Sequence, residues 1–422
     1  MSADAPRLNL DLVTLDPARR IVVCCGSGGV GKTTTAAAVA LRAAEHGRRV
    51  VVLTIDPARR LAQALGLTEL DNNPRRVAGT SGSGTLDAMM LDMKRTFDEV
   101  VLNHTTAERA EQIFANPFYQ SLSSSFAGTQ EYMAMEKLGQ LRARDEWDLI
   151  VVDTPPSRSA LDFLDAPARL GRFLDGPMIR VVAAPARAGG RAYLRVVGAG
   201  FSLFSRVLTR VVGGQLLMDI SAFVGALDTM FGGFRERAQG TYELLRRPET
   251  AFVVVAAPAQ DALREASYFV DRLSTDRMPL AGLVLNRTHP ARAPELSGQR
   301  AEAAAEALVE AGAHPLAAAV LRVHAERMTV AAQELRLAAR FIAAHPDVPV
   351  ARVPALDGDI HDLDGLRRIG TALSADAPDA ASDAGPSDTP GDISDDIPSD
   401  RPDDTNDHGG SRKPPFRSTR SA

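Results

Sequence analysis

Short, continuous runs of apolar residues recur along the chain, and each run ends at glycine, proline or a charged residue. Two runs stand near the amino end, at residues 21–25 and 50–55, with an alanine-rich helical pattern over residues 34–46 between them. Later runs lie at residues 149–152, 252–256, 283–285 and 348–353. Strands that are apolar throughout, and not alternately polar, are typical of a parallel sheet covered on both faces. The pattern predicts an α/β fold with a doubly wound, mostly parallel sheet.

The stretch between residues 152 and 252 is far longer than one crossover helix requires. It has little strand character, so we expect an inserted helical subdomain at residues 162–248. Residues 193–234 within it are rich in Leu, Val, Phe, Met and Gly, with few charges. Two interpretations stay open for these helices. They pack on the core or on a partner subunit, or they form a surface that accepts a hydrophobic or membrane-protein client.

Residues 211–231 have the length of a membrane-spanning helix. Two aspartates, Asp219 and Asp228, interrupt this span and would be costly in lipid. The pair Gly213-Gly214 indicates a break between two amphipathic helices. A transmembrane helix is therefore the less favoured reading of this span.

The remaining segments complete the predicted organisation. Helical spacing of charges predicts surface helices at residues 299–309 and 316–344, and the composition after Ser374 turns to Asp, Ser, Pro, Gly and Ala, typical of a disordered acidic tail. We expect the following parts: an N-terminal segment at 1–18, an α/β core at 19–161 and 249–373, the insert at 162–248 and the tail at 374–422.

Composition limits the compartment and the partners. Hydrophobic residues make up 45% of the chain and charged residues 24%, and the formal net charge of -5 gives no reason to expect binding to nucleic acid. The two cysteines, Cys24 and Cys25, are adjacent in an apolar strand, so we expect buried, reduced thiols on opposite faces of the sheet. The first residues lack the apolar core of a signal peptide. We expect a cytoplasmic protein, and peripheral association with a membrane stays open.

The loop between the first strand and the first helix carries the most specific chemistry. Its glycines let backbone N–H groups approach phosphate oxygens, Lys32 would neutralise the β and γ phosphates of ATP, and the Thr33 hydroxyl would bind Mg²⁺. A dinucleotide site is the rival, because the same glycines satisfy G-x-G-x-x-G, but the Lys32-Thr33 pair favours a nucleoside triphosphate. The expected nucleotide-binding residues are Gly26, Ser27, Gly28, Gly29, Val30, Gly31, Lys32, Thr33 and Thr34.

Two aspartates follow predicted strands. Asp56 ends the second strand, where its carboxylate would orient the attacking water or would simply cap the next helix, and spacing alone leaves both readings open. Asp153 follows the strand at 149–152, as the Walker B carboxylate that reaches magnesium should. The loop after it is formed by Thr154, Pro155, Pro156 and Ser157, and we expect it to sense the γ phosphate.

These motifs together resemble those of a known family. The loop GSGGVGKTT, the run VVLTIDPARRLAQALGL, the segment VVDTPPSRSALDFL from Val151 and LVLNR from Leu283 resemble the arsenical pump-driving ATPase (ArsA) family, which includes the targeting ATPases for tail-anchored membrane proteins. The likeness spans roughly residues 21–372. It implies the deviant P-loop class and an α/β core that dimerises with nucleotide at its interface. It also implies hydrolysis of ATP to ADP and phosphate to drive conformational change.

The resemblance assigns roles to single residues. It makes Asp56 the catalytic aspartate of switch I, beside the catalytic Lys32, and it makes residues 153–157 the start of switch II. It makes Asn286 the residue that reads adenine, with residues 353–356 near the loop that closes over the base.

The chain departs from the family at two points. Ser27 stands where the deviant P-loop normally has a signature lysine that reaches the partner subunit's phosphates, as in an actinobacterial-type member that lacks this lysine. We therefore expect a dimer, and specifically a hetero-oligomer with a lysine-containing paralogue; the alternative is a catalytically weak, nucleotide-binding subunit. The chain also lacks the cysteine clusters that arsenite, zinc or an iron-sulfur group would require.

Overall fold

A computed structural model describes residues 6–56, 58–116, 119–120, 129–155, 236–291, 293–356 and 358–374 of the 422-residue chain. All of them belong to one compact unit, residues 1–383, and a second unit, residues 384–422, falls wholly outside them. The span at 211–231 that has membrane length, most of the expected insert, Pro156, Ser157 and the acidic tail beyond Ser374 also lie outside the described residues.

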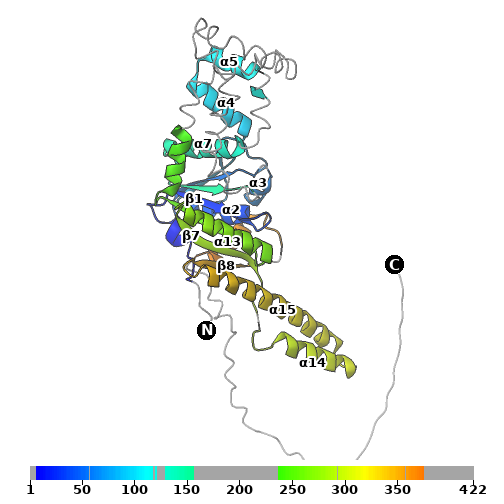
Figure 1. Cartoon of the computed structure of the whole chain (residues 1–422). Helices are drawn as coiled ribbons and strands as arrows, with labels where there is room; N and C mark the ends of the chain where they lie inside the picture. Colours follow the sequence, from blue (N-terminus) through cyan, green and yellow to red (C-terminus); the bar gives the residue numbers. More distant parts are fainter. Residues whose placement is uncertain are drawn as a thin grey trace, which may run out of the picture. The chain divides into compact units, whose positions relative to one another are not determined.

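A sheet of eight strands, in the order β3-β4-β2-β5-β1-β6-β7-β8, runs through the described part of the chain (Figure 1). Every neighbouring pair is parallel except the edge pair of β3 and β4. The strands are β1 (Ile21–Cys25), β2 (Arg49–Thr54), β3 (Arg75–Arg76), β4 (Thr85–Met90), β5 (Leu149–Asp153), β6 (Thr250–Ala256), β7 (Leu280–Thr288) and β8 (Val350–Pro354). The predicted α/β fold with a mostly parallel sheet is confirmed.

All six apolar runs lie on strands, whereas β3 and β4 are absent from the prediction. The reason for missing β4 is Asp87, which interrupts its apolar run. This carboxylate is nevertheless buried, because it accepts hydrogen bonds from Trp147 Nε1 at 2.9 Å and from Arg76 Nε at 2.7 Å. Asp87 can be buried only because the fold supplies these partners. The local sequence pattern around it therefore does not identify β4 as a buried strand.

Helices cover both faces of the sheet, which explains the apolar strands. One face packs against α1 (Asp11–Thr14), α2 (Lys32–Glu45), α3 (Arg60–Ala64) and α16 (Leu363–Ala372). The other face packs against α4 (Met93–His104), α5 (Ala107–Ala115), α7 (Thr129–Arg144) and α13 (Gln260–Thr275). Cys24 faces the first layer and Cys25 the second, and both are fully buried. The expectation of buried thiols on opposite faces is confirmed.

Residues 236–246, within the stretch expected to form the insert, are helical and pack on the second face. Ala238 and Leu245 are buried in the same core cluster as α7 and α13. Arg237 pairs there with Glu136 of α7 at 3.0 Å. This end of the stretch is therefore part of the core.

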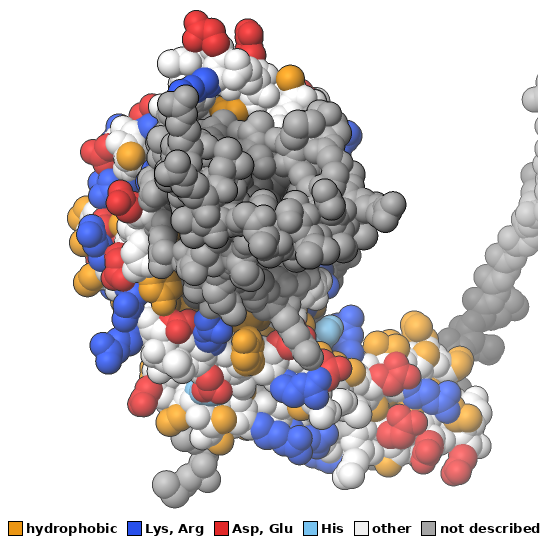
Figure 2. Space-filling view, turned by 45° about the horizontal axis from the view of Figure 1, so that its top comes forward, with side chains coloured by type: hydrophobic (Ala, Val, Ile, Leu, Met, Phe, Trp, Pro, Cys, Tyr) orange, Lys and Arg blue, Asp and Glu red, His pale blue; other side chains and the backbone are white. Residues whose placement is uncertain are grey.

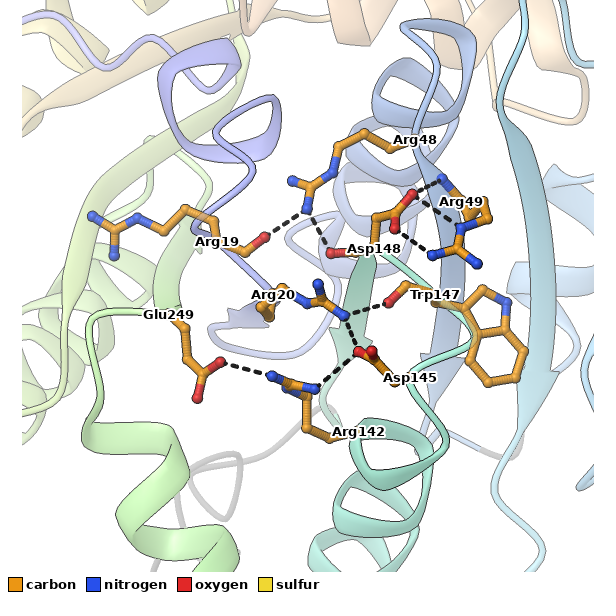
Figure 3. A network of polar contacts seen from close by, with 9 residues as sticks. All are labelled: Arg19, Arg20, Arg48, Arg49, Arg142, Asp145, Trp147, Asp148 and Glu249. Atoms are coloured by element: carbon orange, nitrogen blue, oxygen red, sulfur yellow. Dashed lines mark hydrogen bonds and ion pairs between the residues drawn. The ribbon is translucent and has the colours of Figure 1, made fainter.

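A polar network closes the amino ends of the strands (Figure 3). The buried Arg48 donates to the main-chain oxygens of Thr14 at 2.6 Å, Arg19 at 2.7 Å and Asp148 at 2.5 Å. Beside it, Arg142 bridges Asp145 and Glu249. Because the strands are parallel, this network lies at the edge of the sheet opposite to their carboxyl ends. It joins the segments that enter β1, β2, β5 and β6.

The outer edge of β8 is partly covered by the amino-terminal segment. Arg7 forms a parallel bridge with Val350, Leu8 N donates to the Val350 oxygen at 3.1 Å, and Val350 N donates to the Pro6 oxygen at 2.8 Å. Leu8 and Leu10 are buried beneath α2 and α16. The segment is thus part of the core packing as well as of the sheet.

Between β7 and β8 the chain forms the helices α14 (Gly298–Glu310) and α15 (Pro315–Ala344), which confirm the two expected surface helices. The two pack side by side (Figure 1). Large apolar side chains on α15 are exposed at Leu316, Val320, Val323 and Val330, and Figure 2 shows hydrophobic side chains among charged ones over this pair of helices. Within the described residues, no helix combines the length and apolarity needed to cross a membrane.

Candidate nucleotide-binding site

A cleft of about 930 Å³ opens at the carboxyl ends of the strands. This is where α/β sheets bind ligands, because loops from both halves of the sheet meet there. The cleft brings together residues that are far apart in the sequence: Gly29, Gly31, Lys32, Thr33, Thr34, Asp56, Arg60, Asn286, Arg287, and residues 353–356 and 358–361. The predicted glycine loop, Asp56, Asn286 and the stretch after β8 therefore share one site.

The glycine loop depends on backbone angles that only glycine adopts readily. Gly29 has φ +77° and Gly31 has φ +94°, both in the left-handed region. At Gly31 a side chain is also excluded by space, since an added Cβ would lie 2.2 Å from Asn286 Nδ2. The chain turns at Gly31 directly into α2, so that Lys32 and Thr33 form the first turn of the helix.

Lys32 lies inside the loop. Its Nζ donates to the main-chain oxygen of Ser27 at 2.8 Å, and burial lowers its pKa while the nearby Asp153 raises it. This bond keeps the ammonium group of Lys32 within the glycine loop, close to where the negative charge of bound phosphates would lie.

Asp153 ends β5 and is fully buried. Its Oδ2 accepts hydrogen bonds from Thr33 Oγ1 and Thr54 Oγ1, each at 2.8 Å. Burial raises the pKa of Asp153 to about 6, and the two threonines and Lys32 only partly offset this effect. Oδ1 is buried and makes no hydrogen bond within the described residues. A buried carboxylate oxygen with no protein donor beside a threonine hydroxyl is suited to a cation.

Magnesium fits this donor set. Mg²⁺ prefers oxygen ligands and is commonly held by one or two protein oxygens together with phosphates and water. Asp153 and Thr33 supply such oxygens at the start of α2. The described residues contain no group of three or more His, Cys, Asp or Glu side chains that would hold a metal by themselves.

Asp56 lines the cleft and also caps the following turn. Its Oδ1 accepts from Ala58 N at 3.0 Å, and its own N donates to Thr54 Oγ1 at 3.2 Å. The main-chain oxygen of Ile55 accepts from Gln130 of α7 at 3.0 Å. The reading of Asp56 as the cap of the next helix is wrong, because the N-cap of α3 is Arg59 and no side chain caps that helix. Asp56 does line the cleft, and its role toward the attacking water stays a prediction.

Asn286, near the carboxyl end of β7, contacts the glycine loop. Its Nδ2 donates to the Val30 oxygen at 2.8 Å, and the side chain also lines the cleft. Sequence reasoning missed this bond, because β7 and the loop are joined only by the fold. It also missed Arg60 and Arg287, two arginines of the same cleft. The adjacency of Arg287 to Asn286 in the LVLNR segment was the one available signal.

The segment that follows β5, expected to begin switch II, is anchored to β1 where it is described. Thr154 Oγ1 donates to the Cys24 oxygen at 2.9 Å, and Thr154 N donates to the same oxygen at 3.3 Å. Pro155 follows as the last described residue of this segment. Thr154 is therefore fixed to the strand that leads into the glycine loop.

Comparison with known proteins is consistent with this geometry. The model of a family described as anion-transporting ATPase matches residues 19–308. ATPase ARSA2 of Chlamydomonas reinhardtii is 28% identical over 293 residues, which cover 68% of this chain and 73% of that protein. ATPase GET3 of Malassezia globosa is 31% identical over 155 residues, or 36% of this chain and 44% of that protein.

A putative arsenical pump-driving ATPase of Halobacterium salinarum is 32% identical over 198 residues, which cover 44% of this chain. The matched part spans 29% of that archaeal protein. The chain thus spans less than half the length of the fungal and archaeal relatives, and it spans most of the algal one.

Proposed function

Since the chain belongs to the anion-transporting ATPase family, we propose that it binds ATP with Mg²⁺ in the cleft and hydrolyses it to ADP and phosphate. The observation that carries this proposal is the junction of the glycine loop with Asp153. There Thr33 Oγ1 lies 2.8 Å from a buried carboxylate whose other oxygen has no hydrogen-bond partner among the described residues. ATP turnover would drive the opening and closing of a dimer, as the chain's likeness to ArsA-type ATPases suggests.

In this scheme, the main-chain N–H groups of residues 28–33 bind the phosphates and Lys32 balances their charge. Thr33 and Asp153 would hold magnesium, which would supply positive charge beside the phosphates. Asp153 must be ionised to do so. Asp56 accepts a hydrogen bond from the attacking water and orients it toward the γ phosphorus. As the water oxygen bonds to this phosphorus, the bond to the β–γ bridging oxygen breaks, ADP leaves, and the proton of the water ends on the released phosphate. Asn286 and residues 353–356 contact the adenine.

Ser27 supports a hetero-oligomer. The position offers a short hydroxyl in place of a cation, so two copies of this chain would not supply the charge that a signature lysine brings across a dimer. A paralogue with the lysine would complete the site on this chain. Cations that act in this way accelerate phosphoryl transfer on the order of 10³- to 10⁵-fold.

Steady-state ATP turnover tests the proposal in three preparations. These are the chain alone, the chain mixed with a lysine-containing paralogue, and the variant Ser27→Lys. We expect slow turnover by the chain alone and faster turnover in the other two. Ordinary turnover by the wild-type chain alone would refute the need for a partner. Placing Lys32→Ala in this chain only, within the mixture, identifies which subunit's site turns over.

The second candidate is a nucleotide-binding subunit that regulates its partner without hydrolysing ATP itself. The presence of serine at position 27, where the family has its signature lysine, favours this second candidate as well. In that case Lys32→Ala in this chain would leave the turnover of the mixture largely intact, while the chain would still bind ATP.

A further inference from the structure

Arg287 occupies an irregular position in the sheet next to the cleft. The register between β7 and β8 shifts between Asn286 and Thr288, so Arg287 is an extra residue in β7. Its φ is +60°, in the left-handed region, although it is not a glycine. Bulges of this kind are frequent beside active sites, where they redirect a side chain. A non-glycine residue held at positive φ is likewise concentrated at functional sites.

The bulge directs two consecutive side chains to one loop. In a regular strand, neighbouring side chains point to opposite faces. Here Asn286 Nδ2 reaches the Val30 oxygen at 2.8 Å, and Arg287 Nη1 reaches the Gly29 oxygen at 3.3 Å. Without the irregularity, only one of these residues would face the glycine loop. The backbone strain therefore places a guanidinium against the loop.

Within the described part of the chain, the contact with Gly29 leaves most of the guanidinium's hydrogen-bonding capacity unused. It is a long hydrogen bond to a neutral oxygen, and Arg287 is an exposed residue that lines the cleft. A phosphate oxygen is a stronger acceptor, because the hydrogen bond is then charge-assisted and can be bidentate. Lys32, the other cation at the loop, lies inside it on the Ser27 oxygen.

We propose that Arg287 is a phosphate-binding residue of the ATP site, and that it supplies from within this chain part of the positive charge that Ser27 does not. The inference rests on the proposed function, since it assigns a ligand group of that same cleft. On nucleotide binding, the guanidinium leaves the Gly29 oxygen for the phosphates. The matched control is Arg277, which is also exposed and also has a left-handed φ, +56°, but is not among the residues that line the cleft.

Binding of ATP and of adenosine to the full-length chain, with Mg²⁺ present, tests this assignment. Arg287→Gly removes the side chain and suits a positive φ, whereas Arg287→Lys keeps both the charge and the strain. We expect Arg287→Gly to weaken ATP binding about ten- to a hundredfold, as the loss of one charge-assisted contact implies. Arg287→Lys should recover a large part of the loss, and the control Arg277→Gly should change the affinity less than threefold.

Two measurements separate a phosphate contact from a structural effect. Adenosine, which has no phosphate, should bind the wild type and Arg287→Gly equally, and the melting temperature of the nucleotide-free variant should not fall. ATP binding that is equal in the wild type and Arg287→Gly would overturn the inference and leave the proposed function standing. An equal loss for ATP and adenosine would overturn it as well. A wild-type chain that does not bind ATP at all would instead refute the proposed function.

Discussion

Replacing Asp153 with asparagine should change stability and function in opposite directions. The carboxylate is fully buried, and burial raises its pKa from 3.8 to about 6. The folded chain therefore bears a cost whenever this group is ionised. Asp153→Asn keeps the shape and the acceptor oxygen for Thr33 and Thr54 but removes the charge.

The size of the effect follows from linkage between protonation and folding. A rise of the pKa from 3.8 to about 6 corresponds to about 3 kcal/mol of lost stability at a pH well above 6. The sign follows from the direction of the rise. Well below pH 3.8 the carboxyl is protonated in both folded and unfolded chains and nothing is lost. Stability then falls as the pH rises from 3.8 to about 6 and levels off above it. Between pH 4 and pH 7 the loss amounts to about 2 kcal/mol.

The asparagine introduces a second effect that does not depend on pH. Its amide group would occupy the position of Oδ1, which has no partner in the described residues, and an unpaired buried donor costs about 1–3 kcal/mol. The useful quantity is therefore the change of the stability difference with pH. The free energy of unfolding of Asp153→Asn, minus that of the wild type, should grow by about 2 kcal/mol from pH 4 to pH 7.

Urea unfolding of both chains at several pH values, without nucleotide or magnesium, measures this difference. Asp148→Asn is a matched control of opposite sign, because the hydrogen bond from Arg49 lowers the pKa of Asp148. Asp148→Asn should be less stable than the wild type at neutral pH, and this difference should disappear as the pH falls through the acid range. A stability difference for Asp153→Asn that is constant with pH, or that shrinks toward neutral pH, would refute the reasoning. The same variant should also lose the Mg²⁺ dependence of ATP binding.

Other substitutions test the loop, the switch and the opposite edge of the sheet. Gly31→Ala should abolish ATP binding in equilibrium dialysis, because its Cβ would lie 2.2 Å from Asn286 Nδ2 at a φ of +94°. Lys32→Ala should weaken ATP binding at least about a hundredfold, whereas Asp56→Asn should spare binding and lower turnover of the complex; an equal loss of binding in both would make Asp56 structural. Arg48→Met should lower the free energy of unfolding in urea by about 2–4 kcal/mol and leave ATP affinity unchanged, since it removes a buried donor to several main-chain oxygens far from the cleft.

The sequence was informative wherever local pattern decides structure. The strands β1, β2, β5 and β6 are buried on both faces, so their apolar runs identify them without knowledge of their neighbours. The glycine loop was equally readable, because its angles and its phosphate chemistry require particular residues in a particular order. The position of Asp153 followed from its place at the end of a strand.

What the sequence did not reveal depends on pairing between distant segments. The bulge at Arg287 exists only because β7 pairs out of register with β8, and the bond from Asn286 to Val30 joins residues on different strands and loops. No local pattern encodes either. Asp56 stayed ambiguous for another reason, since one carboxylate both caps a turn and faces the cleft.

The amino-terminal segment that pairs with Val350 gives β8 a protected edge. An edge strand with open N–H and C=O groups is a template for pairing with another chain, and proteins commonly cover such edges. Here a few main-chain hydrogen bonds and the buried side chains of Leu8 and Leu10 hold the amino-terminal segment against β8. Removing residues 6–10 would leave a parallel edge strand open to a second molecule, and we expect concentration-dependent self-association to follow. The strand so exposed ends in residues that line the cleft, so this unintended assembly would also disturb the wall against which the nucleotide binds.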